Sequence, residues 1–332
     1  MANCVECVFF DVGQASANLI NLGDERAIII DTGHKNSGWP LIRYIERYCP
    51  NIELLILTHN DRDHDGGVET LLERFVERIK KIYFLDDRDH KDIRTMALLN
   101  SERFRERVDK AGVIIERLER TDTPVRIFED ARLNIELKIL FPDFQENLNA
   151  NTHNAASGVI QLDIGTQRIL FGGDAELDAW KAIHSHREKA GHNFPLQCNI
   201  LTIPHHGGKI GPKHNKQNLD WLYNEAINSD TGVISAGSRK RHHPREDVIT
   251  AIVQGGTKVI CTQRFEQCDP GFYSKSLNPD WFSLSHKPGD KNGIHCMGSV
   301  VAHVYPDRTE ILKLKQFMRY CREFPCPLCI ST

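Results

Sequence analysis

The densest group of potential metal ligands lies at residues 58–67, which read Thr-His-Asn-Asp-Arg-Asp-His-Asp-Gly-Gly. This segment follows the apolar run Ile52–Leu57, which predicts a fully buried strand. Carboxylates and imidazoles crowded at the end of a buried strand repel one another and lose hydration, and bound cations remove both penalties. The segment therefore predicts a site for one or two metal ions rather than a solvated acidic loop. The side chains available to the ions are His59, Asp61, Asp63 and His64.

This loop needs strands and helices to hold it, and the first half of the chain alternates between the two. Asp11–Gln14 predicts a turn between the first two strands, and the third strand ends in the turn Asp31–Gly33. Gly66 and Gly67 let the backbone bend before the next helix begins. The expected strands are Val5–Phe10, Asn18–Asn21, Ala27–Ile30, Ile52–Leu57 and Ile82–Leu85, and the expected helices are Pro40–Arg47, Val68–Ile79 and Asp92–Lys110, with Gly112 as the last C-cap.

The second half repeats the order of strand, polar loop and helix. Gly158–Ile164 and Arg168–Phe171 predict a hairpin over Gly165-Thr166. We find no internal repeat and no linker, so we predict one α/β domain of two sheets flanked by helices. The expected strands are Val113–Leu118, Val125–Phe128 and Asn134–Leu140 in a second sheet, then Asn199–Ile203, Thr231–Ser235, Lys258–Thr262 and two closing strands.

Composition places the chain among ordinary globular proteins. Its 332 residues, 40% hydrophobic and 26% charged, can bury one large core or two modest ones. A net charge of −3 excludes a global basic field, so any phosphate-binding surface must be local. Apolar runs are far shorter than the roughly twenty residues that span a bilayer. With no secretory signal and ten scattered cysteines, we expect a cytoplasmic protein without a membrane partner.

The order of the polar loops resembles the metallo-β-lactamase superfamily. The resemblance spans about Val5 to Val304. More narrowly, the chain resembles the soluble ComEC-type hydrolase domain of competence DNA-uptake proteins, which reads His-x-Asp-x-Asp-His where most of the superfamily reads His-x-His-x-Asp-His. The resemblance implies a four-layer αββα sandwich of two mixed β-sheets flanked by helices. The motifs that carry it are Asp11–Gln14, Asp31–Gly33, His59–His64, Asn154–Ser157, Gly172–Asp174 and Pro204–Gly207.

Carried over residue by residue, the resemblance assigns the ligands of two divalent ions. Asp174 would bridge the ions, and Asp31 would orient a ligand rather than bind metal. Adjacent side chains at a strand end usually point apart, so one of His205 and His206 would complete the second site, and the other would face substrate or donate a proton. The sequence does not decide between them. The ligand set we assign is His59 and Asp61 for the first ion, Asp63, His64 and His205 for the second, and Asp174 for both.

The third motif departs from most of the superfamily, in which it supplies a histidine to the first metal. Here it contains Asn154 and Ser157, which match the ComEC-type pattern and are assigned to substrate. A first site poorer in nitrogen and richer in oxygen suits Mn²⁺ or Mg²⁺ better than an all-histidine site. His153 lies one position away and is an alternative ligand. The metal identity stays open between manganese and zinc.

A local basic loop at residues 238–245, Ser-Arg-Lys-Arg-His-His-Pro-Arg, matches the family's late histidine-proline motif. Its cations suit a phosphodiester, whose negative charge needs neutralising before attack. His243, which directly precedes the proline, is the better match to a functional histidine. Lys209, Lys213 and Lys216 extend the patch along a nucleic-acid backbone, with a merely solvated loop as the alternative for the last two. The assigned substrate contacts are Asn154, Ser157, Lys209, Arg239, Lys240, Arg241 and Arg245.

Two further groups of possible ligands lie outside these motifs. Cys321, Cys326 and Cys329 would form a structural zinc site with Cys296 or His295, and reduced thiols on a loose end are the favoured alternative. We therefore divide the chain into a hydrolase domain, residues 1–316, and a cysteine-rich tail, residues 317–332. The histidines expected to be solvated, in or near a polar helix, are His184, His186 and His192.

Together these features predict a metal-dependent phosphodiester hydrolase, acting on DNA, in which the two ions share the attacking hydroxide. Asp63, His206 and His243 are the predicted catalytic residues. Two alternatives stay open: a small-molecule phosphodiesterase or esterase, for choline-phosphate esters or cyclic nucleotides, and a subunit that recognises nucleic acid for a larger complex. Without a membrane channel the chain cannot itself import DNA, so a role in uptake would need a protein partner.

Overall fold

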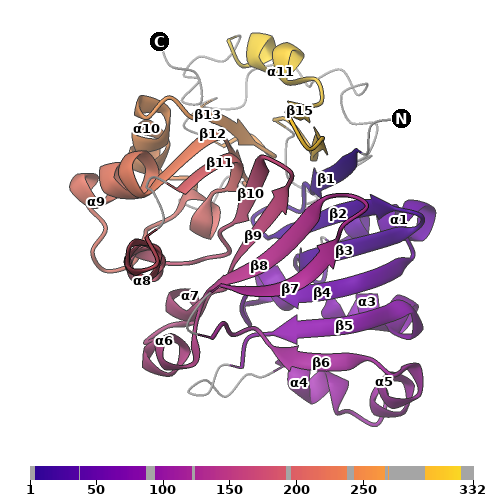
Figure 1. Cartoon of the computed structure of the whole chain (residues 1–332). Helices are drawn as coiled ribbons and strands as arrows, with labels where there is room; N and C mark the ends of the chain where they lie inside the picture. The colour runs from indigo at the N-terminus through magenta and orange to yellow at the C-terminus, as the bar shows by residue number, and fades with distance from the viewer. Residues whose placement is uncertain are drawn as a thin grey trace.

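Two β-sheets stack face to face, with helices on their outer faces (Figure 1). The computed structural model describes residues 4–36, 38–86, 94–121, 124–191, 196–237, 243–265, 268 and 296–322. Within them the first sheet has the strand order β15-β14-β1-β2-β3-β4-β5-β6, and the second has the order β13-β12-β11-β10-β9-β8-β7. Both sheets are mixed, so the architecture is the αββα sandwich that the sequence predicted.

The first sheet is antiparallel from β15 to β3 and parallel from β3 to β6. Its strands are β1 (Val5–Phe9), β2 (Ala17–Gly23), β3 (Arg26–Thr32), β4 (Asn51–Leu57), β5 (Ile79–Phe84), β6 (Ile114–Arg117), β14 (Val300–Val304) and β15 (Thr309–Ile311). The helices between them are α1 (Trp39–Tyr48), α2 (Arg62–Asp65), α3 (Val68–Phe75), the 3-10 turn Val76–Arg78, α4 (Arg94–Leu99) and α5 (Arg105–Ala111).

The second sheet is antiparallel from β7 to β10 and parallel from β10 to β13. Its strands are β7 (Val125–Asp130), β8 (Ile135–Phe141), β9 (Val159–Ile164), β10 (Gln167–Phe171), β11 (Leu196–Thr202), β12 (Ile227–Ile234) and β13 (Lys258–Cys261). The helical segments are α6 (Phe144–Asn149), α7 (His153–Ala156), α8 (Leu177–Lys189), the 3-10 turn Pro204–Gly207, α9 (Lys216–Asp220), the π-helical turn Trp221–Ala226, α10 (Glu246–Gln254) and α11 (Leu314–Cys321).

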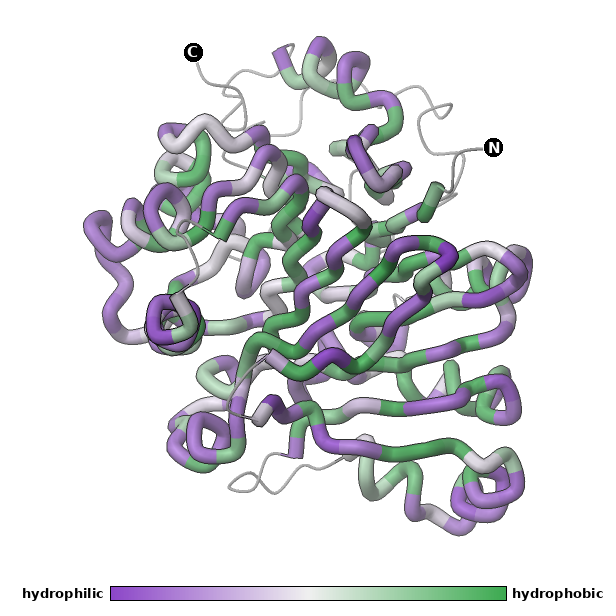
Figure 2. Tube along the Cα trace, in the orientation of Figure 1, coloured by the Kyte–Doolittle hydropathy of each residue, from purple (hydrophilic) through white to green (hydrophobic). Residues whose placement is uncertain are grey.

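The central strands of the first sheet are buried on both faces. Ile28 and Ile30 of β3 point into the core between the sheets, whereas Ala27 and Ile29 pack towards the helices α1 and α3. Successive side chains of a strand point to opposite faces, so a strand covered on both sides reads as a continuous apolar run. The hydropathy colouring in Figure 2 accordingly concentrates green on the strands and purple on the outer helices.

The structure corrects one strand assignment and one helix assignment. Val113–Leu118 was expected in the second sheet, but β6 pairs parallel with β5 at the edge of the first, because the chain returns through α4 and α5 as a crossover connection. The helix expected over 92–110 is broken between α4 and α5. There the side chains of Asn100 and Ser101 donate to the backbone carbonyls of the preceding turn, which competes with helix continuation.

Helix α11 crosses the boundary between the expected hydrolase domain and the expected tail. Phe317 and Cys321 on this helix are fully buried and belong to the larger hydrophobic core, which includes residues of both sheets. Cys326, Cys329 and His295 lie outside the described residues, so the zinc hypothesis for the tail stays a prediction. Among the described residues, the helices are all too short or too polar to cross a bilayer.

Candidate metal centre

The loop after β4 turns into a one-turn helix that points several ligands in one direction. Asp61 is the N-cap of α2, and its carbonyl accepts backbone hydrogen bonds from His64 and Asp65, both 2.9 Å. Gly67 then passes so close to β3 that a Cβ atom there would lie 2.5 Å from the carbonyl oxygen of Thr32. Glycine is therefore required at this close approach, and it lets α3 begin directly behind the loop.

Asp174, which follows β10, lies at the centre of the cluster. Its Oδ1 is 3.1 Å from Nε2 of His64 and 3.8 Å from Nε2 of His206. Its Oδ2 is 3.9 Å from Nε2 of His59 and 3.9 Å from Nε2 of His205. The two carboxylate oxygens thus face two different pairs of imidazoles, which is the arrangement that a carboxylate bridging two ions needs.

The two remaining carboxylates of the loop lie on opposite sides of Asp174. Oδ2 of Asp61 is 3.8 Å from Nε2 of His59, on the side of the first expected ion. Oδ2 of Asp63 is 3.5 Å from Nε2 of His206, on the side of the second. The ligands come from the loops after β4, β10 and β11, because the carboxyl ends of parallel strands in both sheets meet at this edge.

Each histidine of the cluster is held through its other ring nitrogen. Nδ1 of His64 is 2.7 Å from Asp31, Nδ1 of His205 is 2.9 Å from the carbonyl of Lys209, and Nδ1 of His206 is 3.1 Å from the carbonyl of Ser235. Because a carbonyl or carboxylate accepts the Nδ1 proton, Nε2 keeps its lone pair for the cluster.

Asp31 contacts the ring of His64 and also holds the start of the loop. It is fully buried at a left-handed φ of 61°, and its carboxylate accepts from both the backbone and the side chain of Thr58. Such a backbone conformation costs about 1–3 kcal/mol in a residue other than glycine, and it persists only where the surroundings over-determine it. Asp31 therefore contacts both the loop and His64, and its role in orienting a ligand stays a prediction.

Four polar atoms of the cluster test whether it fits a cation. Within the described residues, Nε2 of His59, His64 and His206 and Oδ1 of Asp174 are buried and lack a well-directed hydrogen bond, although Nε2 of His64 and Oδ1 of Asp174 lie 3.1 Å apart. An unsatisfied buried polar group costs about 1–3 kcal/mol, and native proteins seldom retain several together. Divalent cations bound between these atoms would satisfy all four. The ligand atoms of His59, His64 and Asp174, and those of Asp63, His64 and His206, lie within 4.8 Å of one another.

The electrostatics of the cluster agree with that fit. Burial lowers the pKa of His59 to about 4, and the charge of His64 acts in the same direction. Although burial opposes it, the carboxylates of Asp174 and Asp31 raise the pKa of His64 well above its usual value. Burial also disfavours the charged form of Asp174, yet His64 and His206 lower its pKa well below its usual value. Without metal, a proton on His64 thus supplies the positive charge that the ionised carboxylates favour, and a divalent cation would displace that proton.

The third motif lies on the first side of the cluster. Ser157 is fully buried; its Oγ lies 3.2 Å from Nδ1 of His59 and accepts from the backbone N–H of Asp174 at 2.9 Å. This gives Ser157 a place behind the ligands rather than the substrate contact that the sequence suggested. Nδ2 of Asn154 is 3.4 Å from Nε2 of His205, and Nδ1 of His153 is 2.7 Å from Asp61.

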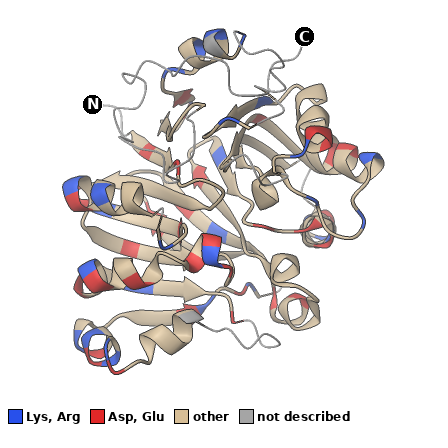
Figure 3. Ribbon diagram, turned by 180° about the vertical axis from the view of Figure 1, so that it is seen from behind, with Lys and Arg blue, Asp and Glu red and all other residues tan. Residues whose placement is uncertain are grey.

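Only residues 243–245 of the basic loop 238–245 are described by the structure. Arg239, Lys240 and Arg241 lie outside the described residues. The ring of His243 is centred 5.1 Å from that of His205, so this histidine lies next to the cluster. Lys209 is exposed, and Lys and Arg residues are interspersed with Asp and Glu in the view of Figure 3.

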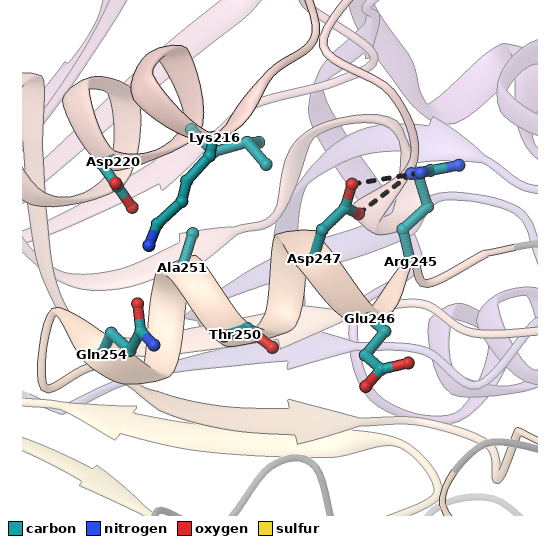
Figure 4. A pocket seen from close by; sticks show the side chains of 9 residues that line it. Lys216, Asp220, Arg245, Glu246, Asp247, Thr250, Ala251 and Gln254 are labelled. Carbon is teal, nitrogen blue, oxygen red and sulfur yellow. Dashed lines mark hydrogen bonds and ion pairs between the residues drawn. The ribbon is translucent and has the colours of Figure 1, made fainter.

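Arg245 has an acidic partner outside the cluster. Its guanidinium donates two hydrogen bonds to Asp247, at 3.0 and 3.1 Å, at the start of α10 (Figure 4). The two residues line a pocket of about 570 Å³ between α9 and α10, and the lining includes none of the cluster side chains. The substrate contact expected for Arg245 stays a prediction.

Two residues of the site were not assigned from the sequence. Thr58 connects Asp31 to the loop, and its Oγ1 also lies 3.2 Å from Nδ1 of His59 and 3.3 Å from Nδ1 of His64. Its place directly before His59 was a usable signal. Ser235 acts through its backbone carbonyl, which any residue has, so no sequence signal exists for it.

Comparisons with known proteins agree with this geometry. A sequence profile described as the Metallo-beta-lactamase superfamily matches residues 10–185. The chain is 25% identical over 284 residues to ComE operon protein 3 of Bacillus subtilis, which covers 78% of this chain and 32% of that protein. It is 25% identical over 237 residues to Recombination protein 2 of Haemophilus influenzae, which covers 68% of this chain and 24% of that protein.

The chain therefore spans about a third or less of the length of these two curated relatives. Among solved structures, the metallo-beta-lactamase fold protein YhfI from Bacillus subtilis aligns with a TM-score of 0.48 at 12% identity, over 77% of this chain and 96% of that one. The profile match covers more than half of the residues and includes the loop after β4 and Asp174. The chain belongs to the metallo-beta-lactamase superfamily.

Proposed function

We propose that this chain is a metal-dependent phosphodiester hydrolase that acts as a nuclease on DNA. The observation that carries the hydrolase proposal is the position of Asp174, whose two carboxylate oxygens face separate pairs of imidazole nitrogens. Two bound divalent ions would supply Lewis acidity for the scissile phosphate and an activated water as nucleophile. The donor set of imidazoles and carboxylates accommodates Mn²⁺ or Zn²⁺.

The chain's own residues would prepare that chemistry in three ways. Asp31, Thr58 and Ser157 orient the ligands through buried hydrogen bonds, so the ligand atoms need little reorganisation when ions bind. On the side of His205, His243 lies close enough to exchange a proton with a leaving group. Burial of His59, His64, His206 and Asp174 keeps bulk water from these side chains and strengthens the charge interactions among them.

DNA as substrate rests on two further observations. The chain is similar to ComE operon protein 3 and to Recombination protein 2 over most of its own length. The segment beside His243 contains Arg239, Lys240 and Arg241, a local cationic group in a chain of net charge −3. A local group of this kind is how such a chain would bind a polyanion. Cytoplasmic location and a protein partner remain part of the same proposal.

The deciding experiment compares substrates on one protein preparation. Purified protein is incubated with plasmid, linear duplex, single strand, RNA and bis(p-nitrophenyl) phosphate, each with Mn²⁺, Mg²⁺ or Zn²⁺. We expect metal-dependent cleavage of DNA that the Asp174→Ala variant, prepared in parallel, does not show. Cleavage of the small diester alone would favour a small-molecule phosphodiesterase. Absence of hydrolysis with a normal metal content would favour a subunit that recognises nucleic acid.

A further inference from the structure

The loop Pro204–Gly207 has an unusual backbone. His205 and His206 have φ values of 52°, with ψ values of 40° and 28°, and Gly207 follows at φ 74°. Left-handed backbone angles in consecutive residues other than glycine are strained, and they persist only where the surrounding structure holds them. An extended backbone would send adjacent side chains to opposite sides. Here the left-handed turn brings both imidazoles to Asp174, one to each carboxylate oxygen.

The two histidines therefore lie on different sides of Asp174. Nε2 of His206 faces Oδ1, as does His64, and it also lies 3.5 Å from Asp63. Nε2 of His205 faces Oδ2, the oxygen shared with His59. The geometry therefore places His205 on the side of the first ion and His206 on the side of the second.

The neighbours of His205 fix the direction of its ring. Its backbone N–H donates to the carbonyl of Gly173 and its Nδ1 lies 2.9 Å from the carbonyl of Lys209, which leaves Nε2 on the side of Asp174. Nδ2 of Asn154, from the motif that lacks a histidine, lies 3.4 Å from this Nε2. Without metal the amide thus occupies the lone pair that an ion would take, and it would release that lone pair when the ion binds.

We infer that His205 is a ligand of the first ion and supplies the nitrogen that the third motif lacks, while His206 belongs to the second ion. The inference rests on the proposed two-ion site. It gives each ion two imidazoles, one carboxylate of its own and a share of Asp174. The two donor sets are His59, Asp61, His205 and Asp174 for the first ion, and Asp63, His64, His206 and Asp174 for the second.

Metal content tests the inference without any activity assay. Purified variants are loaded with Zn²⁺ or Mn²⁺, freed of excess metal, and analysed for bound metal by elemental analysis and calorimetric titration. His205→Gly and His206→Gly fit the left-handed backbone and should fold. Each should keep one of the two ions and bind the other more than about 100-fold more weakly, beyond the usual effect of residues that only orient a ligand.

Double variants identify which ion is lost. His205→Gly combined with Asp61→Ala removes two ligands of the same ion, so one ion should remain. His205→Gly combined with Asp63→Ala should retain neither ion. Added imidazole should restore the missing ion in His205→Gly, because the ligand is replaced in trans. His214→Ala is the matched control from the same loop region, since His214 pairs with Asp247 at 2.9 Å, and it should keep both ions.

Two outcomes would overturn the inference while leaving the hydrolase proposal standing. One is a His205→Gly protein that binds both ions with the affinity of the parent. The other is loss of an ion in His153→Ala but not in His205→Gly, which would return the ligand role to the third motif. A parent protein that never binds two ions would instead contradict the proposed function itself.

Discussion

Two clusters in this molecule bring carboxylates and a histidine within metal-binding distance of one another, and they differ in what else is present. In the first, around Asp174, buried ring nitrogens face carboxylates, and within the described residues no ion pair joins a Lys or Arg to these atoms. In the second, the ligand atoms of Asp143, Glu146 and His186 also lie within 4.8 Å. There the buried guanidinium of Arg120 donates to Asp143 at 3.2 Å and to Glu146 at 2.9 and 3.0 Å.

The second cluster already contains its cation. Asp143 and Glu146 form the capping box of α6, and His186, expected to be solvated, lies 3.2 Å from Glu146. Its polar atoms are therefore satisfied by hydrogen bonds and an ion pair, and it joins α6, α8 and the segment after β6. The comparison shows that a list of ligand types does not identify a metal site. Buried atoms left without partners do.

The largest expected effect comes from Asp174→Asn in the first cluster. Removing the bridging carboxylate should abolish tight metal binding and lower hydrolysis more than about 100-fold, because ligands contribute more than the residues that orient them. The metal-free variant should be no more stable than the metal-free parent, because His64 loses a carboxylate that raises its pKa. Elemental analysis and urea unfolding in chelator measure the two effects. Two tightly bound ions in the variant would contradict the bridging role of Asp174.

The opposite pattern is expected for Arg120→Met. Loss of the buried cation leaves Asp143 and Glu146 as uncompensated carboxylates, so stability should fall by about 3–5 kcal/mol. Bound metal per folded chain should stay that of the parent. Urea unfolding and elemental analysis on one preparation separate the two effects. A drop in bound metal with unchanged stability would contradict the distinction between the clusters.

Metal loading should act on the first cluster alone. Adding Zn²⁺ or Mn²⁺ at 100 times its dissociation constant should stabilise the parent by about 2.7 kcal/mol, because the ion binds the folded chain. Thermal unfolding with and without metal measures this as a rise in Tm. Arg120→Met should show the same rise from a lower baseline. If Asp174→Asn also showed it, the ions would be binding elsewhere.

The smallest expected effect comes from Asp247. This carboxylate pairs with Arg245, as Asp143 and Glu146 pair with Arg120, but it is more exposed. Burial raises its pKa, but hydrogen bonds from Arg245 and His214 lower it to about 2, below the value of about 3.9 of the unfolded chain. Its contribution is present above pH 4 and lost as pH falls through 2. Asp247→Asn should therefore cost less than about 1 kcal/mol at pH 7, and the difference should narrow at pH 3. A difference that stays constant between these pH values would exclude the ion pair as its cause.

Local patterns predicted most of the elements that hold the site. The buried strand before His59, the hairpin of β9 and β10 and the C-cap Gly112, at a left-handed φ of 67°, all follow from periodicity or glycine chemistry, and the structure confirms them. The neighbour of β6 was not predictable in this way, because pairing depends on how the crossover packs.

Details of the site depend on backbone conformation rather than residue type. Nothing in the letters Pro-His-His-Gly indicates that both histidines adopt left-handed angles, so the sequence suggested that only one would face the ions. Burial of Ser157 and the ion pair of Arg245 are likewise results of packing between segments far apart in the chain. Ligand types are readable from sequence, whereas their directions require the fold.

The pairing of β1 with β14 has a consequence for how the chain reaches this structure. Val5 pairs with Val304, so one edge of β1 stays uncovered until β14 has been synthesised far along the chain. Contacts at such long range slow folding, and an open strand edge can pair with other molecules in the meantime. Synthesis of this protein should therefore be sensitive to chaperone supply and to pauses in translation between β1 and β14.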